Sequence, residues 1–303
     1  MSRNNVRILG FLAALGTVFI WAAFLLGTRY AVSGRFTVEE VVFLRLAPAA
    51  ILLVPFMLKL GVTLRGQSIL GTFMLTIGAS AVFPYVVSSG LAFAPASDAG
   101  ILAPGTLPFW AMLAAFVIMG EKPSKQRSLG LFIILIGASF VGLWDVISGA
   151  SKTAWKGHLM FVAGAAFWAV YSAYFRISGL SPLHALVIGV FWGTCAALPV
   201  LLLSGRVTFA DASWNDIAAM GVLQGFFIAV LASLLFSYAV RALGAAQTSG
   251  FGALTPVLVL IGGALFLGEE ITVLKSAGVI CVTIGVVLAS GLYEQRFQKT
   301  SAQ

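Results

Sequence analysis

Two aromatic pairs recur at equivalent places in the two halves of this 303-residue chain. Trp21 and Phe24 lie three positions apart, as do Trp168 and Tyr171, and 147 positions separate the two pairs. Residues three apart share one face of a helix, so each pair predicts a local aromatic surface. Such a surface binds apolar or aromatic groups, and cations through the ring faces. The alternative is that these rings face lipid or pack between helices.

Hydroxyl groups form a second matched set. Tyr85 and Ser89 are followed 148 positions later by Ser233 and Ser237, and Ser88 adds a third hydroxyl to the first group. Spacing of four places each pair on one helix face, where the hydroxyls can line a binding site. A buried serine can equally bond the carbonyl of its preceding turn, and that alternative stays open.

Three more polar residues are candidates for binding or coupling. Gln247 carries a neutral amide that donates and accepts, which suits a zwitterion, although an interfacial glutamine is the other possibility. Arg45 falls inside an apolar segment. It either faces a cavity and attracts a carboxylate, or snorkels or pairs with a nearby acid. Asp98 is the carboxylate best suited to proton coupling.

Carboxylates are otherwise kept to the ends of the apolar segments. Proton-driven exporters place an ionisable group at depth, so the sequence predicts substrate-driven export without tight proton coupling. The histidines, His158 and His184, also fall at segment ends, where an interfacial role is expected. The carboxylates near segment ends are Asp98, Glu121, Asp145, Glu269 and Glu270.

The chain lacks the sequence motifs that several classes of enzyme require. It contains no Walker loop for ATP, no acidic cluster for a membrane transferase and no Ser/His/Asp set. Cys195 and Cys281 fall in apolar segments without a His or carboxylate cluster, so we expect buried thiols and no metal or other cofactor.

The elements that carry these residues are apolar throughout. Hydrophobic residues make up 60% of the chain and charged residues 9%, with a mean hydropathy of +1.04. Soluble domains carry about 25% charged residues, so the chain belongs in a lipid bilayer, and the first segment is expected to remain as a helix. Ten segments reach about 20 residues, the length of a spanning helix. They cover residues 7–28, 38–60, 67–93, 98–119, 126–147, 156–178, 183–204, 213–241, 245–267 and 273–294.

The net charge of +8 lies in short loops, so membrane topology explains it and nucleic acid does not. Lys and Arg are more frequent on the side of the termini, which predicts an inner-membrane protein with both termini cytoplasmic. That side carries Arg3, Arg7, Lys59, Arg65, Lys122, Lys125, Arg127, Arg176, Arg241, Arg296 and Lys299, and the other carries Arg29, Arg35, Lys152, Lys156, Arg206 and Lys275.

The matched residues indicate an internal duplication, with one repeat at residues 1–150 and the second at residues 151–303. Further matches at an offset of 148 are Pro108 with Pro256, Gly120-Glu121 with Gly268-Glu269, Ser124 with Thr272, Gly130 with Gly278 and Gly137 with Gly285. Each half holds five predicted helices, an odd number, so the second half enters the membrane with opposite orientation. The sequence therefore predicts an all-α integral membrane protein whose two inverted five-helix repeats surround a central cavity, as alternating access requires.

Structural roles are expected for the remaining matches. Each Gly-Glu turn ends a helix, its carboxylate is expected to find a partner in the turn, and Ser124 and Thr272 are N-caps. The paired glycines allow close helix approach in lipid. Arg29 and Arg176 end helices on opposite faces, where anchoring explains them. The prolines at 84, 104, 108 and 256 are expected to break or bend helices.

With these motifs in this order in both halves, the chain resembles the drug/metabolite transporter superfamily, specifically its ten-helix EamA branch. The carrying features are the Trp-Ala-x-aromatic phrase of both halves, Leu107-Pro108 through Gly137, and a fuller second copy from Tyr238 to Gly278. Within that branch the chain is most similar to the YddG-type exporters of amino acids and related metabolites.

This resemblance implies a monomeric exporter of small metabolites. With the aromatic pairs, it favours amino acids with apolar or aromatic side chains. The partners expected are this small-molecule substrate and the lipid bilayer. Within transport, the alternative is a broad exporter of aromatic cations, which the absence of a deep carboxylate disfavours. A membrane-embedded transferase and a non-transporting scaffold are alternatives from other classes.

Overall fold

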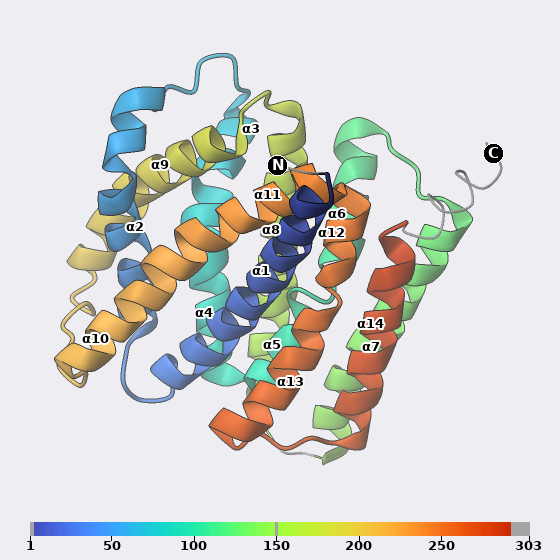
Figure 1. The fold of residues 1–303 in the computed structure, drawn as a ribbon. Coiled ribbons are helices and arrows are strands. Elements are labelled where there is room, and N and C mark those ends of the chain that lie inside the picture. Colours follow the sequence, from blue (N-terminus) through green and yellow to red (C-terminus); the bar gives the residue numbers. More distant parts are fainter. Residues whose placement is uncertain (1–2, 149–150, 292–303) are drawn as a thin grey trace, which may run out of the picture.

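The computed structural model describes residues 3–148 and 151–291, and every regular element in these ranges is helical (Figure 1). The first half holds α1 (Arg3–Val32), α2 (Val38–Leu60), α3 (Ile69–Phe73), the π-helix η1 (Met74–Val82), α4 (Phe83–Phe93), α5 (Ala96–Leu102), α6 (Leu107–Met119) and α7 (Lys125–Ser148). The second holds α8 (Ala154–Ile177), α9 (Pro182–Leu203), α10 (Trp214–Gly221), the π-helix η2 (Val222–Leu231), α11 (Ala232–Leu243), α12 (Ala245–Phe251), α13 (Leu254–Leu267) and α14 (Val273–Ala289).

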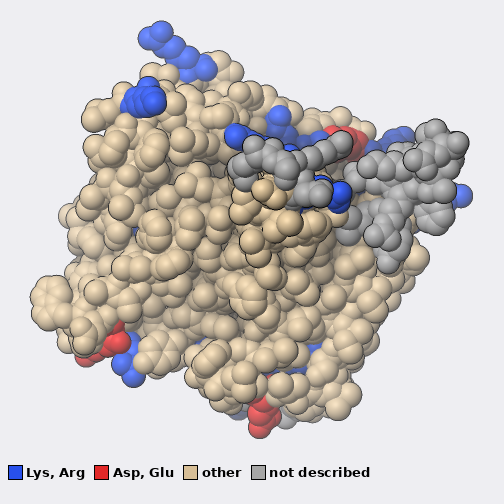
Figure 2. All heavy atoms as spheres, viewed as in Figure 1, with Lys and Arg blue, Asp and Glu red and all other residues tan. Residues whose placement is uncertain are grey.

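Nine helical stretches in the described ranges are long and apolar enough to cross a membrane, and the apolar α14 is shorter at 17 residues. The all-helical membrane architecture expected from the sequence is confirmed. Figure 2 shows charged side chains at the two ends of this face of the molecule and uncharged residues in a broad belt between them. Such a belt matches the hydrocarbon core of a bilayer.

The helices form a bundle in which α7 and α14 lie side by side at one edge and α2 packs on α9 at the other (Figure 1). Helix pairings are reciprocal between the halves. α1 packs on α11 as α8 packs on α4, and α1 packs on α13 as α8 packs on α6. α1 begins and α14 ends at the upper end of the bundle in Figure 1. The turns after α1 and α13 lie at the opposite, lower end, which we call the far end.

Glycines bring α7 and α14 into backbone contact. A Cβ added at Gly137 would lie 2.8 Å from the Gly278 carbonyl oxygen, and one added at Gly130 would lie 2.6 Å from that of Gly285. Each of these four glycines therefore faces a glycine of the other half. The close helix approach expected from the glycine spacing is confirmed.

The helix ends follow the duplication as well. Gly120 and Gly268 adopt left-handed conformations, with φ of 70° and 66°, and end α6 and α13. A residue with a Cβ is strained in this region, which explains glycine at both turns. The expected N-caps are confirmed: Ser124 Oγ accepts from Arg127 N, and Thr272 Oγ1 accepts from Lys275 N.

Two spans depart from regular α-helix at matching places. η1 begins at residue 74 and η2 at residue 222, which is the 148-residue offset of the repeat. Wider π-turns inside membrane helices are frequent at functional sites. A turn at residues 103–106, which contains Pro104, also divides the fourth span into α5 and α6, as expected of that proline.

Candidate functional site

A small cavity lies between the two halves of the chain. Residues of α2, η1, α8, α9, η2 and α11 line it, among them Arg45, Ser80, Trp168, Tyr171 and Ser233. Its volume is about 50 Å³, whereas sites for small organic ligands usually enclose about 300–1,000 Å³. The cavity therefore has room for a few water molecules and must widen to admit a metabolite.

Aromatic rings from both halves form one series beside this cavity. Phe83 links the halves, with its ring centroid 6.3 Å from that of Phe24 and 4.9 Å from that of Trp168. Tyr171 follows at 5.5 Å from Trp168 and stacks on Phe175 at 6.2 Å. Sequence reasoning missed Phe83, which has no aromatic counterpart at the repeat offset to single it out.

Arg45 faces the cavity from α2. The residue is 7% exposed, and its guanidinium carbon lies 5.1 Å from the centroid of the Phe24 ring. Its Nη1 atom has no hydrogen-bond partner among the described residues. Of the two placements left open by the sequence, the structure shows the one in which Arg45 faces a cavity.

The acids nearest to Arg45 in sequence bond other groups. Glu39 accepts from the Tyr85 hydroxyl at 3.1 Å and pairs with Arg206 at 3.3 Å. Glu40 accepts from the backbone nitrogens of Thr37 at 2.9 Å and Thr208 at 3.0 Å, and from the backbone nitrogen of Phe209. Pairing of Arg45 with a neighbouring acid is thus not what the structure shows.

The hydroxyls of Ser80, Ser233 and Ser237 bond the carbonyls of their preceding turns. Ser233 Oγ donates to the Ala229 carbonyl at 3.3 Å, Ser237 Oγ donates to that of Ser233 at 2.8 Å, and Ser80 Oγ donates to that of Thr76. Because a donated proton leaves the oxygen lone pairs free, Ser80 and Ser233 can still accept a hydrogen bond from a ligand in the cavity.

The remaining sequence candidates do not line this cavity. The half-buried Trp21 packs its ring 5.5 Å from that of Phe236. Tyr85 bonds Glu39, as described above, and Ser88 is 1% exposed with no partner for its hydroxyl among the described residues. Ser89, in α4, and Gln247, in α12, are half-buried.

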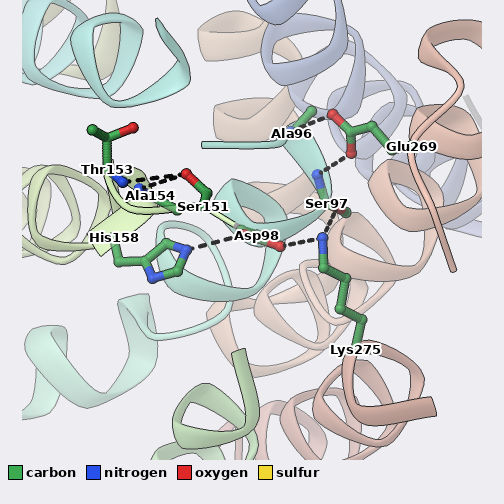
Figure 3. A network of polar contacts seen from close by, with 9 residues as sticks. All are labelled: Ala96, Ser97, Asp98, Ser151, Thr153, Ala154, His158, Glu269 and Lys275. Atoms are coloured by element: carbon green, nitrogen blue, oxygen red, sulfur yellow. Dashed lines mark hydrogen bonds and ion pairs between the residues drawn. The ribbon is translucent and has the colours of Figure 1, made fainter. Parts of the chain in front are cut away.

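Asp98 belongs to a separate buried network of polar side chains (Figure 3). It lies in the first turn of α5, is 1% exposed, and places Oδ1 2.7 Å from Lys275 Nζ and Oδ2 3.0 Å from His158 Nε2. Lys275 also donates to Ser97 Oγ at 3.2 Å. Asp98 of the first half is thereby joined to α8 and α14 of the second.

Two sequence expectations are corrected by this network. Lys275 does not lie in a loop: it is the third residue of α14 and is 5% exposed. The interfacial role expected for His158 is also wrong, because its side chain is 11% exposed and bonds Asp98. The available signal was the position of Lys275, since a basic side chain in the first turn of a helix opposes the helix dipole.

The two Gly-Glu turns also find partners other than those expected. Glu121 forms two hydrogen bonds with Arg176 of α8, at 2.7 and 3.2 Å, and these bonds hold the pKa of the Glu121 carboxyl below its usual value. Glu269 instead accepts from the backbone nitrogens of Ala96 and Ser97, at 2.6 and 2.9 Å (Figure 3). The expectation of a partner within each turn is wrong, because both carboxylates bond the opposite half.

The remaining predicted positions are His184, the two cysteines and several charged residues. His184 Nε2 lies 3.2 Å from the Gly61 carbonyl oxygen at a helix start. Cys195 and Cys281 are free thiols, but Cys195 is exposed and Cys281 is half-buried, so the expectation of two buried thiols is wrong. The described residues contain no group of His, Cys, Asp or Glu able to hold a metal. The side chain of Asp145, and residues Arg296 and Lys299, lie outside the described residues.

Apolar helices long enough to cross a membrane, packed around a cavity that is lined from both halves, define a polytopic membrane protein. The sequence matches the EamA-like transporter family twice, over residues 8–143 and 155–291, and the chain belongs to this family.

Individual relatives agree with this assignment. The uncharacterized transporter YyaM of Bacillus subtilis is 28% identical over 202 residues, which cover 64% of each chain. The chain thus spans about two thirds of the length of that relative. The uncharacterized transporter YcxC of the same organism is 22% identical over 237 residues, or 74% of each chain. A solved crystal structure shares the fold, with a TM-score of 0.60, 19% identity and coverage of 95% of this chain and 98% of that one.

Proposed function

We propose that this transporter exports small amphipathic metabolites, chiefly amino acids with apolar or aromatic side chains, by alternating access. The observation that carries the proposal is the aromatic series from Phe24 to Tyr171, which crosses between the halves beside a cavity that contains Arg45 and Ser233. Rings offer a surface for an apolar side chain. The guanidinium and hydroxyl offer partners for the polar end of the same molecule.

Alternating access is supported by the duplication. Reciprocal helix pairings and matching π-helices make the two halves close structural counterparts. With five spans each, the halves are inverted repeats related by an axis in the membrane plane, and the cavity between them opens to either side by equivalent motions. We further propose that the protein works as a monomer in the inner membrane with both termini in the cytoplasm.

Transport without tight proton coupling is supported by the environment of Asp98. Lys275 lies 2.7 Å from this carboxylate and compensates its charge. A carrier carboxylate has to exchange a proton during each cycle, whereas this one is 1% exposed and held in a buried ion pair between the two halves. The substrate gradient is therefore the driving force that we propose.

A broad exporter of aromatic cations is the second candidate, since ring faces attract cations. Counterflow in proteoliposomes against a panel of amino acids, aromatic cations and nucleosides distinguishes the two substrate proposals. We expect exchange of phenylalanine and leucine, and no concentrative uptake when a pH gradient is imposed. Transport of the cations alone would refute the substrate proposal. Concentrative uptake driven by the pH gradient, and abolished by Asp98→Asn, would refute the uncoupled mechanism.

A further inference from the structure

A buried guanidinium without a full set of partners stands out among the polar groups of the cavity. Arg45 is 7% exposed, and its Nη1 atom bonds none of the described residues. A cation in a low-dielectric interior is costly unless an anion or hydrogen-bond acceptors compensate it. An arginine stays protonated, so Arg45 cannot lose its positive charge. The buried guanidinium therefore needs an anion beside it.

The surrounding helices do not supply that anion. Glu39 and Glu40 begin the same helix but are engaged by Tyr85, Arg206 and the turn at residues 208–209, as their contacts show. Arg45 does not extend to the protein surface either, because it is 7% exposed, lies against the Phe24 ring and lines the cavity between the halves.

The neighbours of Arg45 complete a site for one polar head group. Ser80 and Ser233 line the same cavity, and each has donated its hydroxyl proton to a backbone carbonyl. Their oxygens can therefore only accept, which suits an ammonium group. Trp168 and Tyr171 add ring surface for the apolar part of a ligand. One guanidinium compensates one negative charge, so the matching group is a monoanion, and the planar guanidinium fits the two oxygens of a carboxylate.

We infer that Arg45 is the carboxylate-binding residue of this transporter and that its substrates are monocarboxylates, zwitterionic amino acids included. This inference rests on the proposed function and narrows it: a substrate without a carboxylate leaves the guanidinium uncompensated, and a cationic one is repelled by it. Guanidinium and carboxylate pair through two parallel hydrogen bonds, so Arg45 also orients the substrate.

Competition against labelled phenylalanine in proteoliposomes tests the inference. The competitors are phenylalanine, 3-phenylpropionate, which lacks the ammonium group, and phenylalaninamide, which lacks the carboxylate. In the wild-type protein we expect both acids to compete at least about tenfold more strongly than the amide, since hydrogen bonds to charged groups are strong. Equal competition by the amide would overturn the inference without any variant.

Two variants locate the effect at Arg45. Arg45→Gln should abolish the preference for acids over the amide, whereas Arg45→Lys, which keeps the charge but loses the bidentate geometry, should retain part of it. An unchanged preference in Arg45→Gln would overturn the inference.

A binding measurement separates this inference from the proposed function. We expect 3-phenylpropionate to raise the melting temperature of the purified full-length protein, and Arg45→Gln, if it remains folded, to lose this shift. Binding of the acid without counterflow of any panel member would refute the proposed function and support the role of Arg45. Counterflow of phenylalanine with intact acid binding in Arg45→Gln would do the reverse.

Discussion

At the scale of single residues, the two tryptophans that occupy equivalent positions in the repeats have different surroundings in the structure. Trp168 lines the cavity and touches both Phe83 and Tyr171, whereas Trp21 packs on Phe236 of α11. Equivalent positions in a duplicated chain thus meet different neighbours. The repeat predicts where an aromatic residue lies, but the conformation of the whole bundle decides what it touches.

Replacing these residues separates binding from packing. We expect Trp168→Ala to raise the KM for phenylalanine by roughly tenfold or more, because burial of a large apolar side chain is worth about 1.5–3 kcal/mol. Trp21→Ala is the matched control and should lower the melting temperature with little change in KM. The measurement is concentration-dependent counterflow; an equal rise in KM for both variants would contradict the assignment.

The buried ion pair of Asp98 and Lys275 makes a second residue-level prediction. Asp98→Asn removes the charge 2.7 Å from Lys275 and leaves a buried ammonium uncompensated. Breaking such a pair costs about 3–5 kcal/mol, so the thermal stability in detergent should fall markedly. The double variant Asp98→Asn with Lys275→Met removes both charges and should recover most of the loss. No recovery would mean that Asp98 acts mainly through His158.

At the scale of elements, hydropathy and helix-end signals predict the spans, caps and glycine contacts, because these depend on local pattern and on the repeat. The π-helical turns of η1 and η2 were not predictable in this way: their residues are as apolar as those of neighbouring α-helical turns. The network of Asp98, His158 and Lys275 was equally hidden, since its members lie at the starts of three different helices. Only tertiary packing brings them together.

The contact between α7 and α14 predicts opposite effects for two glycines of one helix. Gly137→Ala places a Cβ 2.8 Å from the Gly278 carbonyl oxygen, whereas a Cβ at Gly142 meets no atom within 4 Å. We expect Gly137→Ala to destabilise the protein by about 1–3 kcal/mol, as overpacking does. Gly142→Ala should be neutral or stabilising by up to about 1 kcal/mol, through higher helix propensity. Melting temperatures in detergent measure both; equal shifts would show that the backbone contact carries no constraint.

At the scale of the whole molecule, two equivalent arginine and glutamate pairs occupy different states. Arg176 and Glu121 are joined, with atoms as close as 2.7 Å. Their repeat counterparts, Arg29 and Glu269, line a cavity of about 240 Å³ at the far end. There Arg29 donates to the Leu91 carbonyl at 2.5 Å, while Glu269 bonds the start of α5. Inverted repeats that exchange conformations would exchange these two arrangements as well.

The ion pair between Arg176 and Glu121 does not respond to pH changes near neutrality. The hydrogen bonds from Arg176 lower the pKa of Glu121. The stabilisation by this pair is therefore present above the ordinary carboxyl pKa of about 4.3 and is lost only as pH falls through the lowered value. Between pH 6 and 8, the exchange of the two pairs should follow substrate and not pH.

Cysteine pairs can test this exchange directly. In a chain with Cys195→Ser and Cys281→Ser, we expect cross-linking of Arg176→Cys with Glu121→Cys to suppress cross-linking of Arg29→Cys with Glu269→Cys, and the reverse. Each cross-link should stop counterflow, and reduction should restore it, because the proposed alternating access needs both arrangements in turn. Single-cysteine variants control for oxidation alone. Molecules that form both cross-links at once would show that the two pairs do not alternate, and the proposed exchange between the halves would have to be abandoned.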